Sequence, residues 1–423
     1  MPRAWIVSIG TELTLGQAVD TNGAWFAARL AERGFDIARH ITLPDELQSI
    51  VAGLREAAEN CDVIAVTGGL GPTEDDLTRA ALAAAAGAEL VRDAASQRQI
   101  QEYFDRVRRP MSPANVAQAD LPRGASALSN TSGTAPGIWM RIGRALAFAL
   151  PGVPFEAKRM YAEQIVPRLT AAFTETGGVI ASRKLNCFGA GEAAIGERIR
   201  DLMQRGRNPE VGTTAQLGVI GIRINARAAN LESAGRMLDE MEGELRARFG
   251  TLIFGRDDET LAATVGRLLV ERRATVCTAE SCTAGLAAEH LTRFAGASRF
   301  FTGGFVTYSD EAKVALLGVD PALIREKGAV SAEVARSMAA GARTRLGTTY
   351  ALAITGIAGP AGGSAEKPVG LVYVAVADAS AIDAHELRFP EQSPRGVIRE
   401  RSVASVLNML RQRIIVEAPS PNR

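Results

Sequence analysis

Residues 61–78 read CDVIAVTGGLGPTEDDLT, and this stretch decides the fold of the first part of the chain. An apolar run over 61–66 leads directly into a turn with glycines at positions 68, 69 and 71. Short continuous apolar runs bounded by glycine turns are typical of strands buried on both faces. Helical patterns flank the run at 45–59 and 75–86. We therefore predict a strand of a parallel sheet with helices on both faces.

The same alternation continues on both sides of this stretch. Strand patterns cover 4–9, 35–43 and 145–154, and helical patterns cover 20–34 and 155–173. In such sheets, ligands collect at the carboxyl ends of the strands. The glycine turns at position 10 and at 68–71 both follow predicted strands. We therefore expect a ligand site at this edge of the sheet.

A chain of 423 residues is too long for one ordinary core. Helical and strand patterns alternate again after position 258, which predicts a second α/β domain built as a sandwich. Between the two lies a smaller α+β segment in which we find no catalytic group of residues. The predicted domains are 1–173 (α/β, nucleotide-binding), 174–257 (small, α+β, connecting) and 258–417 (α/β sandwich), followed by a tail at 418–423.

Composition narrows the classes of protein. Apolar residues make up 47% and charged residues 22%, as in globular proteins. The net charge of +1 and the 5% of aromatic residues argue against direct nucleic-acid binding. The four cysteines form no CxxC motif, the first residues lack the apolar core of a signal peptide, and no apolar run has the length of a membrane span. We expect a reduced, cytoplasmic protein.

The glycine turn of the first domain has features that phosphate binding needs. Gly68, Gly69 and Gly71 let backbone amides approach an anion without a Cβ in the way. A helix beginning near Asp75 would present unpaired amides to the same anion, and Asp75 with Asp76 can hold a hard divalent cation that bridges phosphate oxygens. The alternative is a plain glycine turn followed by an acidic helix cap. Glu12 and Asp20 either join this cleft or serve as caps and solvated side chains.

The third domain offers hydroxyls and a lysine. Ser281 lies at a strand-to-helix junction, Tyr308 ends a predicted strand, and Lys313 belongs to the next helix. An amide hydrolase can work with a serine whose proton is taken by a desolvated lysine. Such a lysine must be buried or close to another cation to be neutral. Alternatively, Ser281 caps a helix and Lys313 is solvated. The glycine-rich turn at 356–363 suits a phosphate or a plain loop.

Four strings of the first domain carry a resemblance. GTELTLGQAVDTN (10–22), TGGLGPTEDDLT (67–78), NTSGTAPG (130–137) and LPGVPFE (150–156) resemble the CinA family of competence/damage-inducible proteins, whose first domain is similar to the molybdopterin-binding MoaB/MogA fold. The resemblance implies an ADP-ribose pyrophosphatase that yields AMP and ribose 5-phosphate and needs a divalent metal, Mg²⁺, Mn²⁺ or Co²⁺.

The resemblance also implies roles for individual residues. Asp45 and Asp76 match functional aspartates of the related molybdopterin enzymes, although Asp45 is equally well placed to cap a helix. The implied metal ligands are Glu12, Asp75 and Asp76. The implied substrate contacts are Gly68, Gly69, Gly71, Thr73, Ser132, Gly133 and Thr134.

The third domain resembles a different enzyme of the same family. AESCTAG (279–285), FTGGFVTYSDEAK (301–313), AITGIAGPAGG (353–363) and EKPVG (366–370) are similar to the PncC-type C-terminal domain, a nicotinamide mononucleotide deamidase. The resemblance implies hydrolysis of the carboxamide to nicotinic acid mononucleotide and ammonia, a step for which no metal is expected.

By position, Ser298 and Lys313 match the nucleophile and the base of that domain, while Ser281 is the alternative nucleophile. Tyr308 matches a further catalytic position. The implied substrate contacts are Thr355, Gly356, Gly359 and Arg395, the last as a partner of the ribosyl phosphate. Two positions depart from the pattern: Ala284 stands where relatives often have glycine, and Asp310 where asparagine is common.

Three interpretations follow. The first is a bifunctional hydrolase of pyridine-nucleotide salvage, with relatives suggesting a homodimer. The second is a non-catalytic partner protein in competence or DNA damage. The third keeps the deamidase and makes the first domain a binder of a pterin nucleotide.

Overall fold

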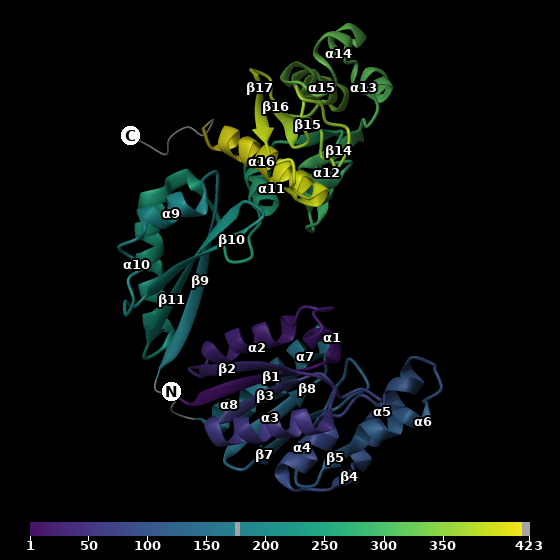
Figure 1. Ribbon diagram of the computed structural model, residues 1–423, viewed down its shortest axis with the longest axis vertical. Coiled ribbons are helices and arrows are strands. Elements are labelled where there is room, and N and C mark those ends of the chain that lie inside the picture. The colour runs from purple at the N-terminus through teal and green to yellow at the C-terminus, as the bar shows by residue number, and fades with distance from the viewer. Residues whose placement is uncertain (174–177, 417–423) are drawn as a thin grey trace. The chain divides into compact units, whose positions relative to one another are not determined.

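The computed structural model describes residues 1–173 and 178–416 (Figure 1). The expected tail at 418–423 and part of the expected boundary at 174–182 lie outside these ranges. The chain forms two compact units, one of residues 1–182 with 225–238 and one of residues 183–224 with 239–423. Each is described by itself.

The first unit contains a six-stranded sheet. Its order is β2 (Asp36–Leu43), β1 (Arg3–Ile9), β3 (Val63–Thr67), β8 (Ala145–Leu150), β7 (Gly137–Ile142) and β6 (Ser126–Leu128). The first four strands are parallel and the last two antiparallel. The predicted parallel sheet is confirmed, and the antiparallel pair at its edge adds to it.

Helices cover both faces of this sheet (Figure 1). Val7 packs on the face of α3 and α4, and its neighbour Ile6 on the face of α2 and α7, because successive strand side chains point to opposite faces. The helices are α1 (Thr11–Thr14), α2 (Thr21–Ala31), α3 (Leu47–Asn60), α4 (Thr78–Ala86), α5 (Ala94–Arg106), α6 (Pro113–Val116), α7 (Pro154–Met160) and α8 (Val166–Ala172). A π-helical turn at Tyr161–Ile165 joins the last two, and β4 (Leu90–Arg92) pairs with β5 (Asp120–Pro122).

Helix α4 begins later than the sequence predicted. It starts at Thr78, so Asp75 and Asp76 lie in the preceding turn and not in the first turn of the helix. The Asp76 carboxylate accepts hydrogen bonds from the amides of Gly71 and Thr73, which closes residues 71–76 into a separate turn. The prediction that the helix begins near Asp75 was therefore wrong by three residues.

The middle segment is a small α+β structure, as predicted. Its sheet has the order β10 (Glu210–Gln216), β11 (Val219–Ala228), β9 (Val179–Phe188) and β12 (Ile253–Arg256). Its helices are α9 (Glu192–Arg198) and α10 (Leu231–Phe249).

A five-stranded sheet organises the rest of the second unit. Its order is β14 (Phe301–Val306), β13 (Val276–Glu280), β15 (Tyr350–Gly356), β16 (Leu371–Ala377) and β17 (Ile382–Arg388). The first three strands are parallel, and β16 and β17 are antiparallel. The helices are α11 (Leu261–Glu271), α12 (Leu286–Thr292), α13 (Asp310–Leu317), α14 (Pro321–Lys327), α15 (Ala332–Leu346) and α16 (Arg395–Val416).

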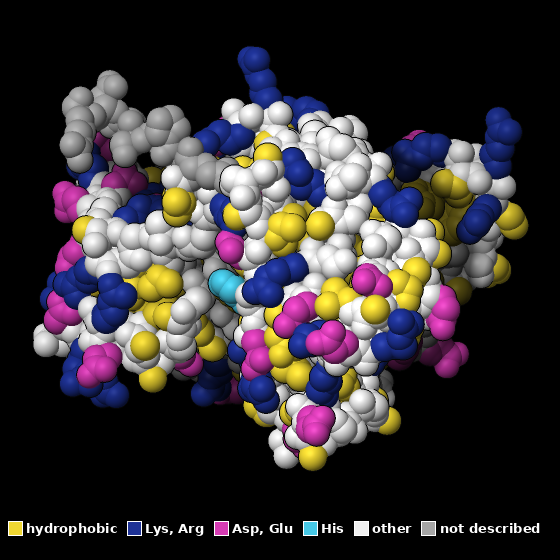
Figure 2. Space-filling view, turned by 90° about the horizontal axis from the view of Figure 1, so that it is seen from above, with side chains coloured by type: hydrophobic (Ala, Val, Ile, Leu, Met, Phe, Trp, Pro, Cys, Tyr) yellow, Lys and Arg dark blue, Asp and Glu magenta, His cyan; other side chains and the backbone are white. Residues whose placement is uncertain are grey.

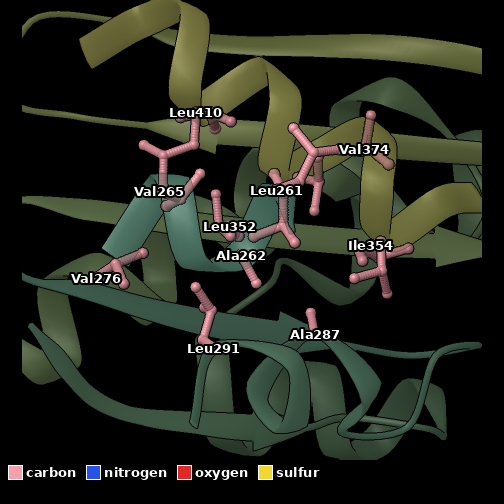
Figure 3. Close-up of a cluster of buried hydrophobic side chains, with 14 of the residues drawn as sticks. Leu261, Ala262, Val265, Val276, Ala287, Leu291, Leu352, Ile354, Val374 and Leu410 are labelled. Carbon is pink, nitrogen blue, oxygen red and sulfur yellow. The ribbon is translucent and has the colours of Figure 1, made fainter. Parts of the chain in front are cut away.

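Two apolar cores sandwich this sheet. Figure 3 shows the first, in which Leu352 and Val374 of the sheet meet Val265 of α11 and Leu410 of α16. The other core packs the opposite face of the strands against α15. The predicted α/β sandwich is therefore confirmed.

On the face seen in Figure 2, basic and acidic side chains are interspersed, and neither kind forms a patch of its own. In the part of the chain that the structure describes, no helix is long and apolar enough to cross a membrane.

Candidate active sites

The first unit has a cavity of about 550 Å³ at the carboxyl ends of β1, β3 and β8. This is the edge of the sheet where the sequence predicted a ligand site. Nine of the predicted residues line it: Glu12, Asp45, Gly68, Gly69, Gly71, Thr73, Asp75, Asp76 and Thr134.

The glycine loop is fixed by backbone geometry. Gly68 and Gly69 have φ values of +95° and +62°, which side chains other than glycine rarely adopt. A Cβ on Gly68 would lie 2.1 Å from the carbonyl oxygen of Ile9. The loop can therefore lie this close to β1 only with glycine at position 68.

Asp76 shapes the loop as well as lining the cavity. Its Oδ1 accepts from the Gly71 amide at 2.7 Å, and its Oδ2 accepts from the amide and the hydroxyl of Thr73 at 2.8 and 2.5 Å. Beneath the loop, buried Arg79 donates to the Leu70 carbonyl at 2.6 Å. Burial lowers the pKa of Arg79, and the nearby Asp76 carboxylate opposes that effect.

Asp45 does not cap α3. The N-cap position belongs to Glu46, whose side chain makes no capping bond. Asp45 instead forms a reciprocal pair with Thr11, because its Oδ2 accepts from the Thr11 amide at 2.7 Å and its own amide donates to Thr11 Oγ1 at 3.1 Å. This pair ties the end of β2 to the residues that follow β1.

The second predicted phosphate turn contributes one lining residue. The amides of Ser132 and Gly133 donate to Asn130 Oδ1 at 3.0 and 2.9 Å, and neither residue lines the cavity. Thr134 does line it.

Asp20, for which the sequence left open a place in this cleft or a role as a cap, lines the cavity and also caps α2, whereas Asn22 and Glu156 line the cavity and were not predicted. Asn22 donates to Thr67 Oγ1 and to the Gly152 carbonyl, at 3.0 and 2.8 Å. The pKa of Asp20 falls to about 2, because burial, which raises it, is outweighed by hydrogen bonds from His40, Ser8 and the Gly23 amide. Asp20, Asn22 and Glu156 all lie within the strings 10–22 and 150–156 that carry the family resemblance. That resemblance was the feature of the sequence that could have identified them as site residues.

The charge of this cavity is one-sided. Its lining contains six carboxylates and no lysine, arginine or histidine: Glu12, Asp20, Asp45, Asp75, Asp76 and Glu156. Over the described residues, no group of three or more His, Cys, Asp or Glu side chains is close enough to hold a metal ion alone. This donor set fits an ion such as Mg²⁺, which takes one or two carboxylates and completes its shell with water and phosphate oxygens.

In the second unit, the carboxyl ends of β13, β14 and β15 bring a serine and a lysine together. Lys313 Nζ lies 3.3 Å from Ser281 Oγ, although 32 residues separate them. The Ser281 amide donates to the Ile354 carbonyl of β15, and the Thr307 amide to the Glu280 carbonyl of β13. Neighbouring strand ends therefore position both side chains.

Lys313 is 1% exposed, so the solvated alternative is wrong. Its Nζ also contacts the carbonyl oxygens of Thr307, Tyr308 and Ser309 at 3.2 to 3.4 Å. Burial lowers the pKa of Lys313, and Asp310, whose Oδ1 lies 3.7 Å from Nζ, opposes this. Burial therefore favours the neutral amine that a base requires.

Ser298 does not join this site. It is exposed, in a 3₁₀ turn at Ala297–Arg299 that precedes β14. The pairing of Val276 with Phe301 and of Glu280 with Val306 places Ser298 at the amino end of β14, whereas Ser281 follows the carboxyl end of β13. A six-residue strand spans about 20 Å. The assignment of Ser298 as the partner of Lys313 was wrong.

Tyr308 and Arg395 form the rim. Arg395 donates to the Gly359 carbonyl at 2.7 Å and to the Tyr308 hydroxyl at 3.2 Å, and Tyr308 is 60% exposed. Thr355 is buried at the end of β15, beside Gly356, and its hydroxyl donates to the Ala329 carbonyl at 2.8 Å. Ser281 thus lies beneath a rim that carries a guanidinium and a phenol.

Residues 281–285 form a turn, so α12 begins at Leu286 and not directly after Ser281, as the predicted strand-to-helix junction implied. Two side chains that the sequence analysis did not single out hold this turn, Glu280 and Arg399. Next to the serine, burial raises the pKa of Cys282 to about 11, which keeps this residue a thiol at neutral pH.

Fold and sites together define a multidomain α/β protein of enzyme type, in which each compact unit carries its own site at a strand-end edge. Three family models match the chain: "Probable molybdopterin binding domain" over 5–171, "Damage-inducible protein CinA KH domain" over 182–255 and "CinA C-terminal domain" over 258–414. The chain belongs to the CinA family.

Similar proteins span its whole length. A "Putative competence-damage inducible protein" of Moorella thermoacetica is 42% identical over 96% of this chain and 98% of its own length. A "CinA-like protein" of Gloeobacter violaceus is 43% identical over 98% of this chain and 97% of its own. Among solved structures, competence/damage inducible protein CihA from Agrobacterium tumefaciens is 42% identical, covers 36% of this chain and 96% of its own, and has a TM-score of 0.35.

Proposed function

We propose that the C-terminal domain is a nucleotide amidase that hydrolyses the carboxamide of nicotinamide mononucleotide. The observation that carries this proposal is the 3.3 Å approach of buried Lys313 Nζ to Ser281 Oγ. A buried lysine and a serine at hydrogen-bond distance are the parts of a Ser–Lys amide hydrolase. The CinA family resemblance supplies the substrate.

In the first step, Ser281 Oγ attacks the carboxamide carbon while Lys313 Nζ takes the hydroxyl proton. The C–N bond then breaks, ammonia leaves with that proton, and an ester joins the acyl group to Ser281. Water, deprotonated by Lys313, opens the ester and restores the serine. Arg395 is placed to pair with the ribosyl phosphate, since a guanidinium binds phosphate oxygens bidentately.

Ammonia release from nicotinamide mononucleotide tests the proposal with a matched pair of variants. Ser281→Ala is expected to abolish turnover, and Ser298→Ala, which alters an exposed serine of the same domain, is expected to leave it unchanged. Turnover that survives in Ser281→Ala would rule out the Ser281–Lys313 mechanism.

We further propose that the N-terminal domain hydrolyses ADP-ribose to AMP and ribose 5-phosphate. The observation that carries this second proposal is the cavity lined by six carboxylates and no cation. Such a lining repels a pyrophosphate unless divalent cations accompany it. When bound, Mg²⁺, Mn²⁺ or Co²⁺ would neutralise phosphate charge and acidify water. Glu12, Asp75 and Asp76 are the candidate ligands, of which one or two would contact the ion directly.

The chain's own groups orient the substrate in this scheme. The glycine loop at 68–71 would offer the amides of Gly69 and Leu70 to the phosphates, since the Gly68 amide donates to the Leu150 carbonyl and the Gly71 amide to Asp76. Asp76 keeps that loop closed through Gly71 and Thr73, and Asp45 keeps the adjoining Thr11 segment in place.

Formation of AMP and ribose 5-phosphate from ADP-ribose, followed by chromatography, measures this reaction. Asp76→Asn is expected to abolish it, and Glu74→Gln, an exposed neighbour outside the cavity lining, is expected to retain it. Full turnover in Asp76→Asn would remove Asp76 from the mechanism. The molybdopterin-binding description of the matching model favours one other ligand, a pterin nucleotide. Tight pterin binding without ADP-ribose turnover would favour that reading.

We also propose a cytoplasmic homodimer that makes no direct contact with nucleic acid. The near-zero net charge and the mixed charges of Figure 2 support the last point. Light scattering of the full chain tests the dimer. A gel-shift titration at low salt tests the nucleic-acid prediction, and a salt-dependent shift would contradict it. A chain that binds a competence or repair protein but turns over neither substrate would support the non-catalytic alternative.

A further inference from the structure

The turn that carries Ser281 is anchored by charged side chains that do not contact Lys313. On one side, the buried Glu280 carboxylate accepts from the amides of Ala287 and Ala288, at 3.0 and 2.9 Å. On the other side, Arg399 Nη2 donates to the Thr283 carbonyl at 2.6 Å, across 116 positions of sequence. The first anchor fixes the start of α12, and the second reaches the middle of the turn.

The backbone of this turn needs such anchors. Ala284 has φ +48° and Gly285 has φ +91°, both in the left-handed region. An alanine there costs about 1 kcal/mol, and such a conformation persists only where its surroundings impose it. The guanidinium on Thr283 is adjacent to this strained residue.

Arg399 differs in role from Arg395, although both lie on α16. Because the two are four residues apart, they share a face of the helix. Arg395 contacts Gly359 and exposed Tyr308 at the rim, whereas Arg399 contacts the fully buried Thr283. The buried Nε of Arg399 has no hydrogen-bond partner within the described residues. Arg399 therefore acts on the protein backbone beneath the site.

The turn also holds amides suited to an oxyanion. Its internal hydrogen bonds use the amides of Ala284 and Leu286, and the Ser281 amide pairs with β15. Within the described ranges, no group accepts from the amides of Cys282, Thr283 and Gly285, and of these three residues only Gly285 is partly exposed. Free amides held rigidly beside a nucleophile stabilise the oxygen that becomes negative when it attacks.

We propose that Arg399 is a positioning residue, which holds the Thr283 carbonyl so that the free amides of the turn stay aligned with Ser281 for the transition state. The inference rests on the proposed amidase function. A displacement of about 1 Å in such a site costs about 100-fold in rate. Loss of Arg399 should lower kcat by about that factor and leave KM nearly unchanged.

The test uses the full chain and variants at three arginines of α16. Arg399→Met is expected to lower kcat with KM within twofold, Arg395→Met to raise KM, and Arg401→Met, on the same helix, to match the wild type. Arg399→Lys keeps the positive charge but lacks the planar guanidinium, so its kcat should lie between those of Arg399→Met and the wild type. Free guanidinium should restore part of the activity of Arg399→Ala, which a merely structural loss would not allow.

A second readout separates this inference from the proposed substrate. An alkyl fluorophosphonate phosphonylates an activated serine: the Oγ–P bond forms, fluoride leaves, and Lys313 takes the proton. The rate at which Ser281 is labelled, followed by intact mass, should fall in Arg399→Met as kcat does. If the wild type is labelled but does not turn over nicotinamide mononucleotide, the amidase proposal is wrong for this substrate. The role of Arg399 in positioning Ser281 would then still be tested by the labelling rates. Equal labelling and kcat in Arg399→Met and wild type, or no guanidinium rescue, would overturn the inference.

Discussion

In the proposed amidase, the Asp310 carboxylate would raise the pH at which Lys313 becomes a neutral base, and replacement of Asp310 by asparagine tests this. The carboxylate favours the ammonium form of Lys313, whereas burial of the lysine opposes that form. Asp310→Asn removes the favourable charge and keeps the size and polarity of the side chain. The pKa of Lys313 should fall further, so the neutral base should be present at lower pH.

The geometry gives the size of this effect. Two unit charges 3.7 Å apart interact by about 1 kcal/mol in water and about 4 kcal/mol at an effective dielectric constant of 20. The Asp310 side chain is 53% exposed, so the lower figure applies. An interaction of about 1 kcal/mol changes the proton affinity about fivefold.

The assay is the pH dependence of kcat/KM for ammonia release. Its acid limb should move to lower pH in Asp310→Asn, since a base works only when deprotonated. Glu311→Gln is the matched control, because Glu311 is the weakest of the charges that raise the pKa of Lys313 and should give a smaller displacement in the same direction. An acid limb that stays in place, or moves to higher pH, would refute the role of Lys313 as the base.

Four further outcomes are expected. Chelation should stop ADP-ribose turnover, and added Mg²⁺ or Mn²⁺ should restore it. The Glu12→Gln variant should need a higher metal concentration for the same rate. Turnover in excess chelator would contradict the need for a metal. Ala284→Gly should raise the free energy of unfolding by less than about 1 kcal/mol. Glycine adopts the left-handed φ of +48° without strain, but the greater entropy of glycine in the unfolded chain cancels part of this gain. Thermal unfolding of the variant and the wild type measures the difference. Leu352→Ala, in the core of Figure 3, should cost about 3 kcal/mol in denaturant titrations, and a cost below about 1 kcal/mol would show a loosely packed core. The pKa of Asp20 falls from 3.8 to about 2 on folding, so ionised Asp20 should stabilise the fold above pH 3.8. This contribution should be lost as the pH drops through about 2. The free energies of unfolding of Asp20→Asn and wild type, measured by denaturant titration, should therefore converge in acid.

The regular elements were largely predictable from local pattern. The buried strands β3 and β13, the helices α10 and α13, and the strand-end location of both sites follow from hydrophobic periodicity and from glycine turns. Helix starts were less predictable, since α4 and α12 both begin after turns that side chains close from a distance. Asp76 closes the first turn, and Arg399 holds the second.

The choice between two serines could not come from local pattern at all. Ser281 and Ser298 both lie in polar segments next to a strand, and only the register of β13 on β14 decides which one meets Lys313. Positional resemblance favoured the wrong serine, because it ignored which end of the strand each residue occupies. The contact of Arg399 with the turn could not be predicted from local pattern either, because its partner Thr283 lies 116 positions away in the sequence.

The carboxylates that line the cavity of the first unit carry a consequence for how this domain can change over time. Like charges that line one cavity repel each other, and a bound cation would offset that repulsion. Apart from Asp20, whose charged form the fold favours, substitutions that neutralise one of these residues and leave its hydrogen bonds intact should lower that repulsion and raise the stability of the cation-free domain. If these acids serve the proposed hydrolysis, a lineage that lost the reaction would be expected to accumulate asparagine and glutamine at the positions other than Asp20.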